Sequence, residues 1–243
     1  MFNGRKIMIT GVGAGMAHRQ AEFFLENGDS VFGLEVNEKA LTAAETEFQT
    51  YGEQFHGYQA DISDTQAVDQ VVSAITAEFG AMDVLINTAG IFDKYTKVFD
   101  VTEDLWDSIM AVDLKGMFFL TQAVTKAMVN EGKGIVINVT SAAGLRADGG
   151  GVAYTVAKHG VVGLTKKLAY ELGEKGIRVN AIAPGRITTA MNENTSELIK
   201  PNLPAQRNGS IDDIANVTFF LASADSDYMH GQILSVDGGW TVL

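Results

Sequence analysis

Short, continuously apolar runs alternate with longer amphipathic stretches along the chain. Val84-Leu85-Ile86 and Ile135-Val136-Ile137 are two of the apolar runs. Strands that are buried on both faces have this composition, and both faces are buried in parallel sheets. The runs that we predict as strands are 6–10, 30–36, 55–59, 84–87, 134–139, 178–183 and 233–236.

Helices are expected between these strands, at 15–28, 38–51, 64–80, 103–130, 152–175 and 211–223. Alternation of strands and helices is typical of βαβ units. The pattern therefore predicts an α/β fold with a doubly wound, Rossmann-like parallel sheet, in a single domain over 1–243. All three prolines fall in the irregular segment 184–210. This segment is too long for an ordinary connection, so we expect a substrate lid at about 187–210.

Composition and charge exclude several classes of protein. Lys and Arg number 18 against 30 Asp and Glu, a net charge of −12, which disfavours nucleic acid because phosphates require basic partners. There is no cysteine, so disulfides and thiolate sites are excluded. The first strand begins too early for a signal peptide, and no apolar run approaches the roughly 18–20 residues of a membrane span. We expect a cytoplasmic protein.

A glycine cluster lies between the first strand and the first helix, in Thr10-Gly11-Val12-Gly13-Ala14-Gly15-Met16-Ala17. Glycines allow a sharp turn and close backbone approach, and the helix N-terminus offers N–H groups to phosphates. Alone, such a cluster could be only a tight turn. Its position after a strand favours a nucleotide site, with Gly11, Gly15 and Met16 as binding residues.

Acidic residues end the second and third predicted strands. Glu35 could accept hydrogen bonds from both adenosine ribose hydroxyls and would repel the extra phosphate of NADP, which favours NAD(H). The alternative is an ordinary solvated glutamate. Asp61, followed by Ile62, could accept the adenine amino group. It could equally cap a helix, a role for which Ser63 and Asp64 compete.

Small residues end the fourth predicted strand, in Asn87-Thr88-Ala89-Gly90. Small side chains leave room beside a ligand, in the crevice at the carboxyl ends of parallel strands. We expect Asn87 and Gly90 to line the cofactor site there. The alternative is a plain turn at the end of a strand.

Tyr154 and Lys158 are four residues apart in a predicted helix, so their side chains share one face. A tyrosine has a pKa of about 10, and a neighbouring ammonium lowers it by stabilising the phenolate. Tyr154 could then exchange a proton with a substrate oxygen, while Ser141, after the fifth strand, hydrogen-bonds that oxygen. A nicotinamide would exchange the hydride. Without this context, a Tyr-x-x-x-Lys pair carries little meaning.

The ordered set of motifs resembles the classical short-chain dehydrogenase/reductases over almost the whole chain, from 6 to 242. The set is Thr-Gly-x-x-x-Gly at 10–15, Asn-x-Ala-Gly at 87–90, Ser141, Tyr154-x-x-x-Lys158 and Pro184-Gly185. The resemblance implies a seven-stranded parallel sheet, Tyr154 as acid/base and Ser141 as the residue that orients the substrate. It also implies that Lys158 binds the nicotinamide ribose and that Ile187 and Thr189 contact the carboxamide.

Two residues depart from the family pattern. Ala17 stands where the third glycine of the loop is usual, and one methyl should only loosen packing slightly. Asp113 stands where an asparagine usually completes a catalytic tetrad and holds a water. Aspartate has two acceptor oxygens but no donor when ionised, so it could keep the water or only accept backbone N–H bonds. We expect a working enzyme with a shifted pH optimum.

The final segment 231–239 resembles the last strand through which family members commonly form tetramers. Trp240, Val242 and Leu243 follow it, and we expect these apolar groups to be exposed in a lone chain. The sequence therefore predicts a homotetramer.

Three functions are compatible with these motifs. The favoured one is an NAD(H)-dependent oxidoreductase acting on a small-molecule alcohol or ketone. The second is a 3-oxoacyl-carrier-protein reductase. Most of those use NADPH and bind their acidic partner through arginines, which 130–132 and 168–171 lack. The third is a non-catalytic nucleotide-sensing protein, which only the departure at Asp113 favours. The substrate is not readable from the sequence.

Overall fold

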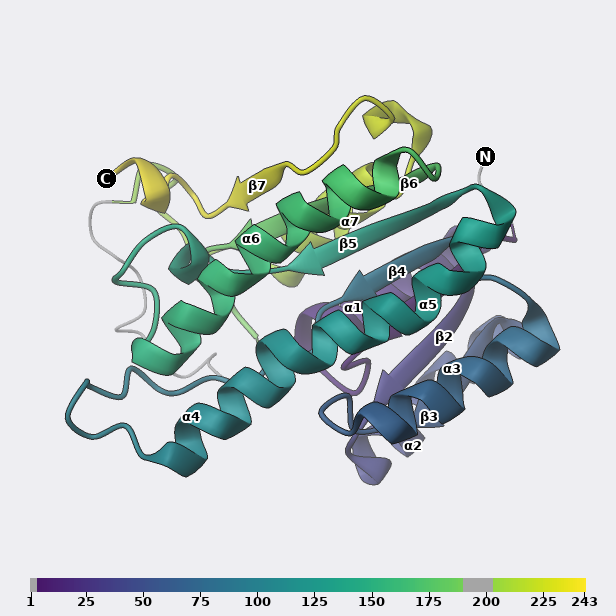
Figure 1. Ribbon diagram of the computed structural model, residues 1–243, viewed down its shortest axis with the longest axis horizontal. Coiled ribbons are helices and arrows are strands. Elements are labelled where there is room, and N and C mark those ends of the chain that lie inside the picture. Colours follow the sequence, from purple (N-terminus) through teal and green to yellow (C-terminus); the bar gives the residue numbers. More distant parts are fainter. Residues whose placement is uncertain (1–3, 190–202) are drawn as a thin grey trace.

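The computed structural model describes residues 4–189 and 203–243. Within these ranges, seven strands form one parallel sheet in the order β3-β2-β1-β4-β5-β6-β7 (Figure 1). The strands are β1 (Lys6–Thr10), β2 (Ser30–Glu35), β3 (Phe55–Gln59), β4 (Val84–Asn87), β5 (Gly134–Val139), β6 (Ile177–Pro184) and β7 (Ile233–Val236). The chain runs outward from β1 to β3 and then crosses to β4. The predicted doubly wound, Rossmann-like sheet is confirmed.

Helices cover both faces of this sheet. They are α1 (Gly15–Glu26), α2 (Glu38–Phe48), α3 (Thr65–Phe79), α4 (Glu103–Met110), α5 (Met117–Glu131), α6 (Val152–Gly173) and α7 (Ile211–Leu221). Short helical turns are η1 (Gln49–Gln54), η3 (Ala142–Gly144), η5 (Ala224–Ser226) and η6 (Trp240–Val242). Each helix lies at a stretch that the sequence pattern assigns to a helix.

Two apolar cores lie on opposite faces of the sheet. Phe24, Phe48 and Ile214 bring α1, α2 and α7 onto one face. Val72 and Leu120 belong to the core under α3, α5 and α6 on the other, the face turned to the viewer in Figure 1. Because helices cover both faces, the central strands can be apolar at every position, as the sequence pattern indicated.

The helix predicted over 103–130 is present from 103 to 131, but it is not α-helical throughout. Between α4 and α5 lies a π-helical turn, η2 (Ala111–Gly116), which contains Asp113. A Cβ at Gly116 would come within 2.4 Å of the carbonyl oxygen of Ile62. The turn therefore packs directly on backbone beyond β3. Such π turns are frequent at functional sites.

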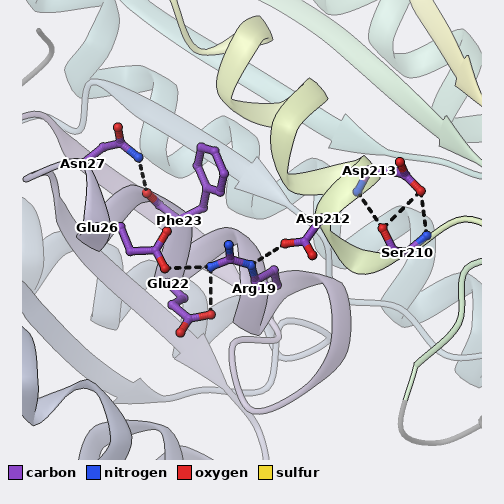
Figure 2. A network of polar contacts seen from close by, with 8 residues as sticks. All are labelled: Arg19, Glu22, Phe23, Glu26, Asn27, Ser210, Asp212 and Asp213. Atoms are coloured by element: carbon purple, nitrogen blue, oxygen red, sulfur yellow. Dashed lines mark hydrogen bonds and ion pairs between the residues drawn. The ribbon is translucent and has the colours of Figure 1, made fainter.

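An arginine ties α1 to α7, as Figure 2 shows. Arg19 of α1 donates to Asp212 at 2.6 Å, to Glu22 at 2.8 Å and to Glu26 at 3.1 Å. At the start of α7, Ser210 and Asp213 form a capping box (Figure 2). The contacts fix the start of α7 against the helix that follows the glycine loop.

The C-terminal turn η6 corrects one expectation. Trp240 is only 5% exposed, because it packs with Ala142 and Leu203. Its indole N–H donates to Asp148 at 3.3 Å, and Arg146 donates to its carbonyl oxygen. Trp240 is therefore buried within its own chain and is no argument for an interface. In the described ranges, no helix is long and apolar enough to cross a membrane.

Candidate active site

The carboxyl ends of β1 and β4 are joined by one hydroxyl. Thr10, at the end of β1, accepts the N–H groups of Thr88 at 3.0 Å and Ala89 at 2.9 Å. Gly11 follows with φ of 81°, a left-handed conformation that favours glycine. A Cβ at Gly11 would lie 3.2 Å from the Cα of Ala89. The glycine loop is thus held against the strand that ends in the Asn-x-Ala-Gly motif.

The start of α1 has the properties of a phosphate cradle. Its N-cap, Ala14, provides no side-chain hydrogen bond, and the first turn has no acidic residue. The first N–H groups of a helix lack intrahelical acceptors, so an anion can take these positions. Gly15 has φ of 65°, and Met16 packs against the core. These residues fit the pyrophosphate of a dinucleotide.

The carboxylate of Glu35 lies against the glycine loop. Its Oε2 accepts the N–H of Gly13 at 3.0 Å, and its Oε1 accepts the N–H of Asn37 at 2.9 Å. A Cβ at Gly13 would come within 2.8 Å of Oε2, so glycine permits this contact. Glu35 is therefore fixed by backbone donors rather than freely solvated. Each of its oxygens still has a lone pair for a hydroxyl.

Two aspartates follow β3, and only one of them caps a helix. Asp64 is the N-cap of α3, accepting the N–H groups of Gln66 and Ala67. Asp61 instead accepts the N–H and hydroxyl of Ser63, at 2.8 and 2.7 Å. The helix-cap alternative for Asp61 is therefore wrong. Asp61 is exposed and Ile62 is buried, which leaves the Asp61 carboxylate accessible to a ligand.

Asn87 does not line an open crevice with its side chain. It is 2% exposed, and its amide donates to Thr121 and to Asn138, both at 2.9 Å. The amide of Asn138 in turn donates to Thr165 at 3.0 Å. The Asn87 side chain thus links β4 to β5 and α5 within the protein. Its Oδ1 has no hydrogen-bond partner among the described residues, so an acceptor remains for a ligand, and the place of Asn87 beside the cofactor stays a prediction.

Four predicted residues meet at the carboxyl ends of β4 and β5. Lys158 Nζ lies 3.0 Å from Asp113 Oδ2 and 5.4 Å from the centroid of the Tyr154 ring. The Ser141 side chain lies close enough to Tyr154 to lower its pKa, and it accepts the N–H of Ala143 at 3.1 Å. Asp113 and Lys158 are almost fully buried. Of the four residues, Asp113 comes from η2, Tyr154 and Lys158 come from α6, and Ser141 follows β5.

Asp113 uses both of its oxygens. Oδ1 accepts the N–H of Ile91 at 2.8 Å, while Oδ2 forms the ion pair with Lys158. Gly90 lies beside this pair, since a Cβ there would be 3.0 Å from Oδ2 and 3.3 Å from Lys158 Nζ. The carboxylate therefore combines backbone support with contact to the lysine. The bond from Ile91 is the backbone contact that the sequence analysis offered as one alternative, and the ion pair with Lys158 is an additional contact.

The electrostatics of Tyr154 differ from the expectation of a lowered pKa. Burial raises the pKa of Tyr154, and the negative charge of Asp113 adds to this. The charge of Lys158 and the nearby Ser141 side chain lower the pKa of Tyr154, but burial outweighs them. Burial also lowers the pKa of Lys158, yet Asp113 more than offsets this and the net pKa is raised. The lysine is therefore an ammonium and the tyrosine a neutral phenol at pH 7.

The last predicted cofactor residues lie at the start of the lid segment. Ile187 is buried and pairs with Gly209 across a parallel bridge. The methyl group of Thr189 would be 3.8 Å from a Cβ at Gly15, which brings Thr189 to the glycine loop. Of the predicted lid, 190–202 lies outside the described residues. Leu203 packs under η6.

Two residues in contact with Tyr154 were missed by the sequence analysis. The ring of Phe92 stands edge-on to the Tyr154 ring, with centroids 5.0 Å apart. Asp93 accepts the backbone N–H of Tyr154 at 3.0 Å. Their position two and three residues after the Asn-x-Ala-Gly motif was the only signal in the sequence.

A doubly wound seven-stranded sheet, a glycine cradle and a Ser-Tyr-Lys cluster together define a nicotinamide-type oxidoreductase. Comparison with known proteins agrees. The family model for enoyl-(acyl carrier protein) reductase matches residues 11–241. The chain belongs to the short-chain dehydrogenase/reductase family.

Relatives of several specificities resemble the chain. It is 33% identical to 3beta-hydroxysteroid dehydrogenase 2 of Eggerthella lenta, covering 98% of this chain and 95% of that one. It is 32% identical to a 3-oxoacyl-(acyl-carrier-protein) reductase of Thermotoga maritima, covering 99% of each. The crystal structure of levodione reductase superimposes with a TM-score of 0.92 at 34% identity, covering 100% and 99% of the two chains. NAD+-bound xylitol dehydrogenase gives a TM-score of 0.92 at 28% identity, covering 98% and 99%.

Proposed function

We propose that the protein is an NAD(H)-dependent oxidoreductase that interconverts a secondary alcohol and a ketone. The observation that carries this proposal is the cluster of Ser141, Tyr154, Lys158 and Asp113 at the same sheet edge as the glycine cradle. Bound nicotinamide would supply or accept the hydride. The residues that would hold the cofactor are Gly11, Gly15, Met16, Glu35, Asp61, Ile62, Asn87, Gly90, Tyr154, Lys158, Ile187 and Thr189.

The chain's own residues provide the proton chemistry. Ser141 can hydrogen-bond the substrate oxygen from its place beside the Tyr154 hydroxyl. Tyr154, a neutral phenol at pH 7, donates its proton to the oxygen of a ketone during reduction. In the reverse direction it must first be deprotonated, so alcohol oxidation should increase with pH. Lys158 stabilises the phenolate, and Asp113 keeps Lys158 charged.

Glu35 is the basis for proposing NAD(H) rather than NADP(H). Its carboxylate is held at the glycine loop by Gly13 and Asn37, so it cannot easily move away from a ligand. A phosphate on the adenosine ribose would approach this fixed negative charge. Val36, the next residue, offers no positive charge in compensation.

Two alternatives have less support. A 3-oxoacyl-carrier-protein reductase is favoured by the Thermotoga maritima relative. However, an acidic carrier protein would meet a chain of net charge −12 with no arginine at 130–132 or 168–171. A nucleotide-sensing protein without catalysis would not need the contact of Ser141 with Tyr154. We also propose a homotetramer in the cytoplasm, the latter because the chain has no cysteine.

The test begins with a panel of secondary alcohols, sugars, hydroxy acids and cyclic ketones, read by NADH absorbance. Tyr154→Phe keeps the ring and removes the transferable proton, so kcat should fall by at least about 100-fold. NADH binding, measured by nicotinamide fluorescence, should change little. Tyr170→Phe is the matched control, because Tyr170 lies on the same helix but is 82% exposed. Near-normal turnover of Tyr154→Phe would refute the proposed role of Tyr154.

A further inference from the structure

Helix α6, which carries Tyr154 and Lys158, begins without a cap from its own segment. Its N-cap is Gly151, which has no side chain to accept a hydrogen bond. The acceptor comes from Asp93, which is 58 residues earlier in the chain. One carboxylate oxygen of Asp93 accepts the N–H of Gly151 at 2.8 Å, and the other accepts the N–H of Tyr154 at 3.0 Å. Asp93 thus satisfies two donors that the helix leaves open.

Asp93 is a buried charge with an unusual partner. It is 2% exposed, and across 4–189 and 203–243 no ion pair joins it to a basic side chain. Carboxylates are rarely buried to this degree unless they are paired. Here the positive end of the α6 dipole and the two N–H groups take the place of a cation. Among the described residues, the carboxylate accepts hydrogen bonds only from this helix start.

The loop that carries Asp93 is held in a strained turn. Lys94 and Tyr95 have φ of 52° and 61°, a left-handed conformation that costs free energy in residues other than glycine. The N–H of Thr96 donates to the Asp93 carbonyl oxygen at 3.0 Å and closes the turn. A Cβ at Gly151 would be 2.5 Å from Asp93 Oδ2 and 2.6 Å from the Thr96 carbonyl oxygen. The turn is therefore packed directly on the start of α6.

Phe92, the residue before Asp93, contacts the ring of Tyr154. The ring of Phe92 meets the Tyr154 ring edge-on, at an interplanar angle of 89°, and meets Tyr95 in the same way. Two consecutive residues of one loop thus hold the backbone and the ring of the same tyrosine.

We propose that Asp93 is a positioning residue for proton transfer, which fixes the backbone of Tyr154 by capping α6 from the loop after β4. This inference rests on the proposed function, in which Tyr154 carries the proton. Asp93 acts through Tyr154 and the helix start, and its carboxylate is occupied by their N–H groups. A misplacement of about 1 Å at a reacting group can reduce turnover about 100-fold, so a loose helix start is costly for catalysis.

The first experiment compares Asp93→Ala with Asp64→Ala in the full-length protein. Asp64 is a matched control because its carboxylate also accepts two N–H groups at a helix start, that of α3. For Asp93→Ala, we expect kcat to fall by about 10- to 100-fold, while the KM for substrate changes less than about threefold. Asp64→Ala should keep kcat within about twofold of the parent. A kcat of Asp93→Ala equal to that of Asp64→Ala would overturn the proposal.

Asp93→Asn separates position from charge and preserves the test if Asp93→Ala fails to fold. Asparagine keeps one acceptor, so kcat should lie between those of the parent and Asp93→Ala. Burial and the charges of Asp93 and Asp113 raise the pKa of Tyr154, whereas Lys158 and Ser141 lower it. The rise of kcat/KM with pH in alcohol oxidation should therefore move to lower pH in Asp93→Asn. If Asp93 acted on Tyr154 only through its charge, Asp93→Asn would move this profile but reach the kcat of the parent at high pH, and that result would overturn the proposal.

Hydrogen–deuterium exchange gives a readout that does not depend on activity. The Tyr154 N–H should exchange faster in Asp93→Ala, because its acceptor is lost, and α3 should be unaffected. If the Tyr154 N–H exchanged faster in Asp93→Ala while kcat stayed unchanged, Asp93 would only cap the helix, and the positioning role would be overturned. An active Tyr154→Phe would instead count against the proposed function, so the two failures are distinguishable.

Discussion

Replacing Asp113 by asparagine tests the buried ion pair at the centre of the site. Asp113 serves two donors, the N–H of Ile91 at 2.8 Å and the ammonium of Lys158 at 3.0 Å. Asparagine has almost the same size but only one acceptor oxygen. Its NH2 group must therefore face one of the two donors. The substitution removes a charge and one acceptor while leaving the packing nearly unchanged.

The expected loss of stability follows from burial. Removing one partner of a buried ion pair typically costs about 3–5 kcal/mol. Since asparagine still satisfies one donor, we expect about 3 kcal/mol, which lowers Tm by roughly 6–12 °C in a chain of this size. The raised pKa of Lys158 means that this stabilisation is full below the ordinary lysine pKa of 10.5. The stabilisation is lost as pH rises through the raised pKa that Lys158 has in the folded protein. The difference in Tm between the parent and Asp113→Asn should therefore narrow in strong alkali.

Asp113→Asn should also change the pH dependence of catalysis. The charge of Asp113 raises the pKa of Tyr154, so Asp113→Asn should move the rise of kcat/KM in alcohol oxidation to lower pH. Asp29→Asn is the matched control, because Asp29 is equally buried but pairs with Arg5 before β2, away from the site. It should lower Tm without moving the pH profile. If Asp113→Asn changed Tm but not the profile, Asp113 would be a structural residue. If neither changed, the reasoning would be refuted.

The remaining predictions concern cofactor choice, the glycine loop and assembly. NADH should bind more tightly than NADPH by fluorescence titration, and Glu35→Ala should narrow the difference; tighter NADPH binding in the parent would contradict the argument. Thr10→Val leaves two partly buried N–H groups without their acceptor, so unfolding measured in urea should show a loss of about 1–3 kcal/mol in stability, whereas a loss below about 0.5 kcal/mol would be incompatible with these bonds. Light scattering should give about four times the 26.0 kDa chain mass, and a monomer at micromolar concentration would exclude the tetramer.

The strands could be predicted well from the sequence because a strand that is buried on both faces is apolar at every position. Runs such as Val84-Leu85-Ile86 are apolar at every position, and the structure buries all three residues completely. The predicted ends differ by one residue, as at β6, where the structure begins with Ile177 and ends with Pro184. Ser141, Tyr154 and Lys158 were found because their order and spacing form a specific set.

The features that the sequence did not predict depend on distant partners. The π turn at Asp113 has a helical local sequence, and its Gly116 packs against the carbonyl of Ile62, a distant contact that no local pattern shows. Asn87 turns inward because Thr121 and Asn138 provide partners that no local pattern shows. Asp93 could not be recognised from the pattern of apolar and polar residues, because the helix that it caps has its N-cap 58 residues later in the chain.

The strand order also constrains how the chain can be synthesised and folded. β1 lies between β2 and β4, so its second edge has no partner until residues 84–87 have left the ribosome. Any sheet that β1 to β3 form during that interval has an open, apolar edge, which is a template for pairing with another chain. Pairing of strands far apart in sequence is also intrinsically slow. Yield in cells should therefore be sensitive to translation rate and chaperone supply between the emergence of β3 and β4, even for variants with full stability once folded.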